Sequence, residues 1–249
     1  MTAVQQRRLD YKFATTHGGK KYNQLISVSD KVLPRSVDNR QWCPSPKDQG
    51  QEGSCSAFSS IAHARYWQAK MGKEVQEFSE NFQYYSEREL EGTVDQDAGA
   101  ATLEDACKVL LNTGACEESI WPYDQATLFT KPPPEAYANA IKYRPTSYYG
   151  MFTENQFKHC LAAGWPVLHG FAVPASFMDQ SVAETGIWQP QTNEQIVGGH
   201  AVLRVGYDDD KQAYLTLNSW GAYWGMNGYF WMPYSFAHSD MCDDHFTLR

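Results

Sequence analysis

The sequence contains no apolar run long enough to span a membrane, and no hydrophobic segment of the signal-peptide kind lies near its start. These absences predict a protein that contacts no membrane and is found in the cytoplasm. Positive charge is also scarce, because the chain has 21 basic and 29 acidic residues and a net charge of −8. An acidic chain repels phosphate backbones, so we expect no nucleic-acid partner.

Cysteine is sparse, and its spacing argues against a zinc site. The six cysteines form no CxxC pair and no Cys/His cluster with zinc-binding spacing. A chain of 249 residues can bury a sufficient core without disulfide bonds. We therefore expect six free thiols, which agrees with a cytoplasmic protein. The acidic run at residues 208–210 offers too few ligands for a cation and is interpreted as a turn.

One of these cysteines lies where a glycine-rich loop meets a helical pattern. Apolar positions from Phe58 to Ala69 recur at helical spacing, and Gly72 supplies a stop signal. Cys55 therefore lies in the first turn of a helix, where free N–H groups and the positive end of the dipole favour a thiolate. Gln49 precedes it by six residues, so its amide could donate to an oxyanion that forms beside the sulfur.

Two further stretches supply a base and a group to orient it. Residues 198–207 predict a strand with His200 at its start, and residues 213–217 predict the next strand, which ends just before Asn218. The polar linker between them is short, so a hairpin is expected to bring His200 and Asn218 together. A cysteine, a histidine and an amide can act as nucleophile, base and orienting group.

These stretches together resemble the papain-like cysteine peptidases. The motifs that carry the resemblance run in the family's order and include Gln49-Gly50, Gly53-Ser54-Cys55, His200-Ala201-Val202, Asn218-Ser219-Trp220-Gly221 and Asn227-Gly228-Tyr229. His200 follows Cys55 by 145 residues, within the family's range, and Asn218 follows it by 163, slightly beyond that range. The resemblance implies an α+β fold with two lobes. A helical lobe would pack beside an antiparallel β-rich lobe, with the active site in the groove between them.

The resemblance also implies a function and a set of site residues. A cysteine peptidase would hydrolyse peptide bonds in a peptide or protein substrate, with no cofactor and no metal. Cys55, His200 and Asn218 would form the catalytic triad, and Gln49 would complete the oxyanion hole. Substrate-binding roles are implied for Gly53, Ser54, Gly99, Ala100, Gly199 and Trp220. In the family, the tryptophan at the last of these positions shields the His–Asn hydrogen bond from water.

Two positions depart from the family pattern. Glu52 replaces the cysteine three residues before the nucleophile, so the family's disulfide cannot form there. Ser56 replaces the aromatic residue that follows the nucleophile, which puts the shape of the cleft in question. Two other functions therefore stay open. One is an acyl transferase with the same triad, and the other is a catalytically inactive papain-like binding protein.

We divide the chain into a basic N-terminal extension at residues 1–34, a mainly helical lobe at 35–148 and a mainly β lobe at 149–249. The extension has six basic and two acidic residues, a net charge of +4, so the remainder carries −12. We expect the extension to dock on the acidic body near the cleft and to restrict substrate access, with a disordered tail as the alternative. The oligomeric state is not predicted. The apolar contacts of the docked extension would come from Tyr11, Phe13, Tyr22, Leu25 and Ile26.

Overall fold

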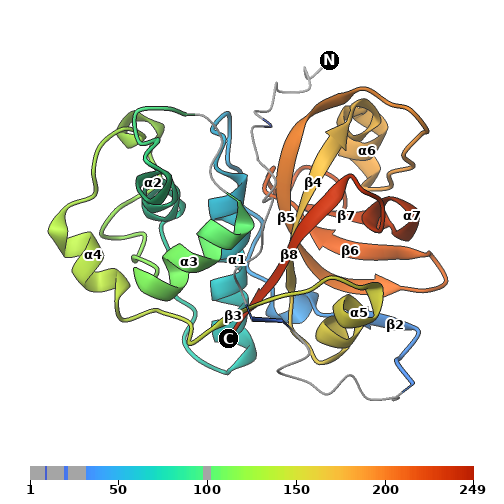
Figure 1. Cartoon of the computed structure of the whole chain (residues 1–249), viewed down its shortest axis with the longest axis horizontal. Coiled ribbons are helices and arrows are strands. Elements are labelled where there is room, and N and C mark those ends of the chain that lie inside the picture. Colours follow the sequence, from blue (N-terminus) through green and yellow to red (C-terminus); the bar gives the residue numbers. More distant parts are fainter. Residues whose placement is uncertain (1–8, 10–19, 22–31, 98–101) are drawn as a thin grey trace.

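The computed structural model describes residues 9, 20–21, 32–97 and 102–249. Among these residues, four α-helices precede residue 141, and most strands of a large sheet follow it. The helices α2, α3 and α4 lie on one side of α1, and the sheet lies on the other side (Figure 1). This arrangement agrees with the predicted α+β class. The helices of this part are α1 (Cys55–Lys70), α2 (Glu80–Glu91), α3 (Leu103–Asn112) and α4 (Pro134–Ala140).

The N-termini of three helices follow capping signals in the sequence. The Ser79 side chain accepts a hydrogen bond from the backbone N–H of Phe82 at the start of α2. Thr102 caps α3 in the same way. Thr153 and Gln156 form a complete capping box at the start of α5 (Glu154–Ala162). Each cap satisfies N–H groups that have no partner inside the helix, which fixes where the helix begins.

The sheet has eight strands. Apart from the parallel β1–β3 pair, its strand pairs are antiparallel. The predicted β5–β6 hairpin is confirmed, although β5 begins four residues before His200, which therefore lies inside the strand and not at its start. The strands in sheet order are β1 (Lys20–Lys21), β3 (Tyr148–Gly150), β8 (Cys242–Leu248), β4 (Val167–Pro174), β5 (Ile196–Asp208), β6 (Ala213–Leu217) and β7 (Tyr229–Pro233), and β2 (Ser36–Asp38) pairs with β5.

Strand β5 takes part in the two largest buried cores among the described residues. Ala201, Leu203 and Val205 belong to the core that contains Cys55 and Ile61 of α1. Val202 and Tyr207 belong to the other core, which is rich in aromatic side chains. Alternate side chains of a strand point to opposite faces, so one strand can take part in both cores. The helix that begins with Cys55 is thereby packed against the strand that contains His200.

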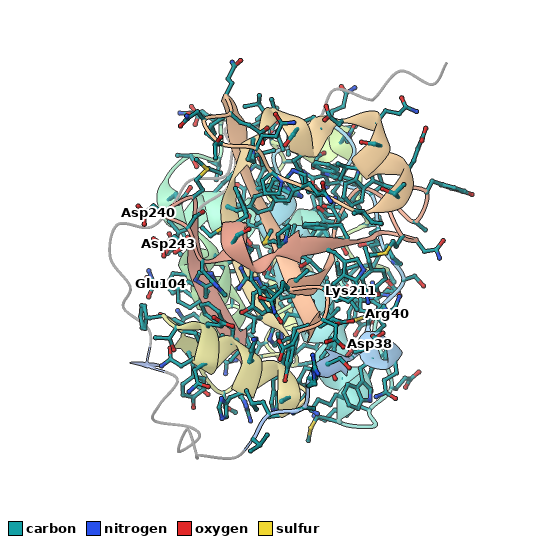
Figure 2. The ribbon with its side chains drawn as sticks, turned by 90° about the vertical axis from the view of Figure 1, so that its right-hand side faces the viewer. Asp38, Arg40, Glu104, Lys211, Asp240 and Asp243 are labelled. Carbon is teal, nitrogen blue, oxygen red and sulfur yellow. The ribbon has the colours of Figure 1, made fainter. Side chains whose placement is uncertain are left out.

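Strand β2 pairs with β5 and thereby fixes the segment that leads to Gln49. Val37 pairs with Tyr207, and Asp38 accepts hydrogen bonds from Arg40, which follows it, at 2.6–3.0 Å. Figure 2 shows Asp38 and Arg40 beside each other, on the same side of the view as Lys211. The approach to the Gln49 loop is therefore anchored to the sheet that carries His200.

Several short elements were not predicted from the sequence. Besides β2, β3 and β8, they are the helices α6 (Gln180–Thr185) and α7 (Tyr234–Ala237) and the 3-10 turns Arg40–Trp42, Gln125–Thr127 and Ala175–Met178. All six cysteines are free, as expected. Within the part of the chain that the structure describes, none of the helices has the length and apolar character needed to cross a bilayer.

Candidate active site

The β5–β6 hairpin brings His200 and Asn218 into contact. His200 Nε2 lies 2.8 Å from Asn218 Oδ1, and the two side chains are 0% and 3% exposed. Asn218 Oδ1 also accepts a hydrogen bond from the backbone N–H of Ser219, which supports the assignment of the amide oxygen. An oxygen acceptor at Nε2 requires that this nitrogen carry the proton, so the lone pair of neutral His200 lies on Nδ1, which can act as a base.

Aromatic rings enclose this pair. The ring of Trp220 stacks on His200 with centroids 4.8 Å apart and an interplanar angle of 27°. The ring of Phe171, directly opposite His200 in β4, approaches at 5.8 Å and 69°. Trp220 is itself buried. Rings in these positions exclude water from His200 and strengthen its hydrogen bond to Asn218.

Cys55 is the first residue of α1, as expected, and its side chain is 1% exposed. Burial raises the pKa of the Cys55 thiol to about 12, and a hydrogen bond from the backbone N–H of Ala201 lowers it only in part. Burial therefore favours the neutral thiol of Cys55 over the thiolate in this arrangement and opposes the effect of the helix start. The cost of burying the charge exceeds the benefit of the helix dipole, and exposure of the site to water would reverse that balance.

Gln49 is fully buried and held at both ends of its amide. Its Oε1 accepts a hydrogen bond from Ser219 Oγ at 2.6 Å, and its Nε2 donates to the backbone carbonyl of Glu52 at 2.8 Å. An amide nitrogen has two N–H groups, so one remains for another acceptor. Ser219, the residue after Asn218, therefore connects the His200 partner to Gln49. Sequence reasoning passed over Ser219, although it lies inside the Asn-Ser-Trp-Gly motif.

Glu52, the first departure from the family pattern, is buried and contacts a tyrosine. Its Oε2 lies 2.9 Å from the Tyr123 hydroxyl oxygen, within hydrogen-bond distance. The same hydroxyl lies 2.7 Å from the backbone carbonyl of Gln49. Burial raises the pKa of Glu52 to about 7, although the tyrosine hydrogen bond opposes the shift. No sequence signal pointed to a link between Glu52 and Tyr123.

Ser56, the second departure, also contacts a buried acid. Its hydroxyl donates to Glu87 Oε2 at 2.6 Å, and Gln83 Nε2 donates to Glu87 Oε1 at 2.8 Å. Glu87 is 0% exposed, and burial raises its pKa to about 8. A serine at this position therefore fills polar space between α1 and α2, where an aromatic residue would meet a carboxyl group.

Of the remaining predicted site residues, three lie in the described part of the chain. Gly53 donates its backbone N–H to Asp97 at 3.3 Å, and Ser54 is the buried residue before α1. The backbone N–H of Gly199 donates to the carbonyl of Leu9 at 2.7 Å. Gly99 and Ala100 lie outside the residues that the structure describes.

Leu9 shows where one part of the N-terminal extension lies. It is buried and belongs to the aromatic core that includes Trp220. It packs so closely on Gly198 that a Cβ atom at Gly198 would lie 2.2 Å from the Leu9 carbonyl oxygen. Further along, β1 pairs with Tyr149 and Gly150 of β3. The five apolar residues expected to dock the extension lie outside the described residues.

The comparisons with known proteins all indicate one protein family. Residues 33–245 match the sequence profile described as papain family cysteine protease. An uncharacterised peptidase C1-like protein of Acanthamoeba polyphaga mimivirus is 34% identical over 253 residues, which cover 92% of this chain and 79% of that protein. A cathepsin B-like protein of Giardia intestinalis is 32% identical, over 82% of this chain and 70% of its own length.

Solved structures agree with these sequence matches. Xylellain, a cysteine protease from Xylella fastidiosa, superposes with a TM-score of 0.86 at 32% identity, over 98% of this chain and 97% of that one. Digestive procathepsin L 3 of the Tenebrio molitor larval midgut superposes with a TM-score of 0.71 at 23% identity, over 98% of this chain and 76% of that one. The second likeness concerns the fold alone.

Proposed function

The chain belongs to the papain family of cysteine proteases, and from this premise we propose that it hydrolyses peptide bonds through a Cys-His-Asn triad. Cys55 would be the nucleophile, His200 the base and Asn218 the group that orients the base. Gln49 would donate to the oxyanion. The observation that carries the proposal is the 2.8 Å contact between His200 and Asn218 on the strand packed against the Cys55 helix.

The proposed reaction proceeds through a thioester. His200 Nδ1 takes the thiol proton of Cys55, and the sulfur attacks the carbonyl carbon of the substrate. The oxyanion accepts hydrogen bonds from Gln49 Nε2 and from the backbone N–H of Cys55. Protonated His200 then gives its proton to the leaving amine as the C–N bond breaks. Water, activated by His200, hydrolyses the thioester and restores the free thiol.

We also propose that the N-terminal extension restricts access to this site. The support is the position of Leu9, which occupies the backbone N–H of Gly199 beside His200 while Cys55 is 1% exposed. A substrate that pairs with Gly199 beside His200 would have to displace Leu9, so the extension must move before such a substrate binds.

The triad is tested by three substitutions, assayed with a peptidyl aminomethylcoumarin amide chosen from a substrate library. Cys55→Ala should abolish turnover and leave the melting temperature within a few degrees of wild type, because alanine is tolerated at a helix start. His200→Ala should lower kcat more than Asn218→Ala, since the asparagine acts only through the histidine. Wild-type turnover by Cys55→Ala would exclude the thiol mechanism.

Product analysis separates hydrolysis from the other two functions. Hydrolysis predicts the free acid as the main product even when an amine acceptor is added, whereas an acyl transferase would form the amide. An inactive binding protein would give neither product, and a peptidyl epoxide would leave Cys55 unlabelled.

A further inference from the structure

The Tyr123 hydroxyl contacts two residues of the loop that positions Gln49. It lies 2.7 Å from the Gln49 backbone carbonyl and 2.9 Å from Glu52 Oε2. Tyr123 reaches this loop from 74 positions further along the chain, and its ring packs edge-on against Phe58 of α1 with centroids 5.1 Å apart. A rigid side chain, fixed by α1, therefore holds both ends of the Gln49–Glu52 turn.

Proton counting indicates which form of Glu52 suits this geometry. A phenol has one proton, so Tyr123 can make one full hydrogen bond as a donor. If Glu52 is ionised, two acceptors compete for that proton. If Glu52 is protonated, its carboxyl donates to the Tyr123 oxygen, and Tyr123 donates to the Gln49 carbonyl. Only the protonated form supplies a proton for each of the two short contacts.

We propose that Glu52 and Tyr123 are positioning residues that hold the oxyanion loop through a chain of hydrogen bonds from the Glu52 carboxyl to Tyr123 and on to the Gln49 carbonyl. The inference rests on the proposed role of Gln49 as an oxyanion donor. Glu52 stands where the family pattern has a disulfide-forming cysteine, so a proton-dependent link here takes the place of a covalent one.

The surroundings of Glu52 favour its neutral form. Its Oε1 is buried and has no hydrogen-bond partner among the described residues, an arrangement that is far more costly for a carboxylate than for a neutral acid. The carboxylates of Asp97 and Asp124 face it and favour protonation, whereas Arg88 and the Tyr123 hydroxyl favour ionisation. Burial outweighs these opposing groups and raises the pKa of Glu52 to about 7.

A pH dependence follows from this arrangement. As the pH rises through about 7, Glu52 loses its proton, and Tyr123 shares its own proton between Gln49 and the new carboxylate. The hold on Gln49 then weakens. The oxyanion exists only after the sulfur has attacked, so the loss should lower kcat and leave KM nearly unchanged.

Tyr123→Phe in the full-length protein tests the link. It should lower kcat roughly tenfold with less than a twofold change in KM, because a displaced oxyanion donor weakens transition-state binding. Tyr137→Phe is the matched control, since Tyr137 also donates to a glutamate, Glu89, at 3.1 Å and far from the loop. It should behave as wild type. Equal kcat values for Tyr123→Phe and Tyr137→Phe would overturn the inference.

Glu52→Gln tests the proton dependence, because its amide can donate to Tyr123 at every pH. The variant keeps this hydrogen bond and should therefore fold as wild type does. The ratio of its kcat to that of wild type should rise as the pH increases from 6 to 8.5. Titration of Cys55 and His200 is common to both proteins and cancels in the ratio. A ratio that does not change with pH would reject the proposed role of the Glu52 proton.

A double-mutant cycle separates this inference from the proposed function. If Tyr123 acts through Gln49, Tyr123→Phe should have little further effect on kcat in a Gln49→Ala background. Full additivity of the two effects would overturn the positioning role. An unchanged kcat in Gln49→Ala alone would instead reject the oxyanion role of Gln49, and with it the premise of this inference.

Discussion

At the scale of single residues, two buried acids accompany Cys55, the proposed nucleophile. Glu52 precedes Cys55 by three residues, and Glu87 accepts a hydrogen bond from Ser56, which follows it. A carboxylate at Glu87 would raise the pKa of the Cys55 thiol further, by electrostatic repulsion of the thiolate. Burial raises the pKa of Glu87 to about 8, which favours its neutral form at neutral pH and limits this repulsion.

Glu87 should therefore link stability to pH. Its pKa is near 4.5 when unfolded and about 8 when folded, so the folded state binds more protons between these values. The contribution of neutral Glu87 to the free energy of unfolding is fully present below pH 4.5. It is lost as the pH rises through about 8. Glu87→Gln keeps an acceptor for Ser56 but cannot ionise. Between pH 5 and pH 8, the free energy of unfolding should fall by a few kcal/mol less in Glu87→Gln than in wild type. One pKa unit corresponds to about 1.4 kcal/mol.

Urea unfolding at the two pH values measures this difference. Glu89→Gln is the control, because Glu89 lies on the exposed part of the same helix. Identical pH dependence in wild type and Glu87→Gln would show that Glu87 does not titrate as described.

At the scale of elements, local signals predicted some parts of the fold and missed others. The start of α1 and the β5–β6 hairpin were predicted from residues close together in sequence, and the caps of α2, α3 and α5 depend on equally local signals. Strand β8 could not be predicted, because its sequence is polar and Asp244 has a φ of 57° beside a register shift against β4. It is a strand because β3 and β4 pair with it.

The same limit applies to the candidate site. Gln49, Cys55, His200 and Asn218 were found because they belong to short motifs. The contact of Tyr123 with Glu52 and that of Glu87 with Ser56 join residues 71 and 31 positions apart, and no local pattern reports such pairs.

The contact between Leu9 and β5 gives a prediction about the N-terminal extension. Deletion of residues 1–30 should raise kcat/KM at both low and high salt. The rise should be smaller at high salt if charge assists docking. Deletion should also speed alkylation of Cys55 by iodoacetamide at neutral pH, because a hydrated thiol has a lower pKa than a buried one.

Gly198→Ala provides a point variant for the same idea. Its Cβ would collide with the Leu9 carbonyl, so the variant should raise kcat/KM in the full-length chain and have no such effect after deletion. Equal kcat/KM with and without residues 1–30 would reject restriction of access by the extension.

At the scale of the whole molecule, the two proposed lobes share elements. Strand β2 lies within residues 35–148 but pairs with β5 of the β lobe. Strand β5 contributes to both cores, and Asn39 donates its side-chain amide to the carbonyl of Leu161. These contacts tie the two proposed lobes together and help to keep the Cys55 helix in place relative to His200.

The thiols of the whole chain lead to a last prediction. Cys55, Cys107, Cys116 and Cys160 are buried, and Cys43 and Cys242 are partly buried. Burial raises the pKa of Cys43, Cys116 and Cys242 to about 12 and that of Cys107 well above its usual value. The reactive thiolate is thereby suppressed at these positions, so oxidation should be slow.

We therefore predict that the protein needs no disulfide for folding. Protein that is purified without reductant, denatured and alkylated with iodoacetamide should gain six carbamidomethyl groups by intact mass. The same treatment after reduction is the control and should give the same mass. Two or more disulfides before reduction would contradict both the free-thiol arrangement and the cytoplasmic location, since the described fold pairs none of its six cysteines.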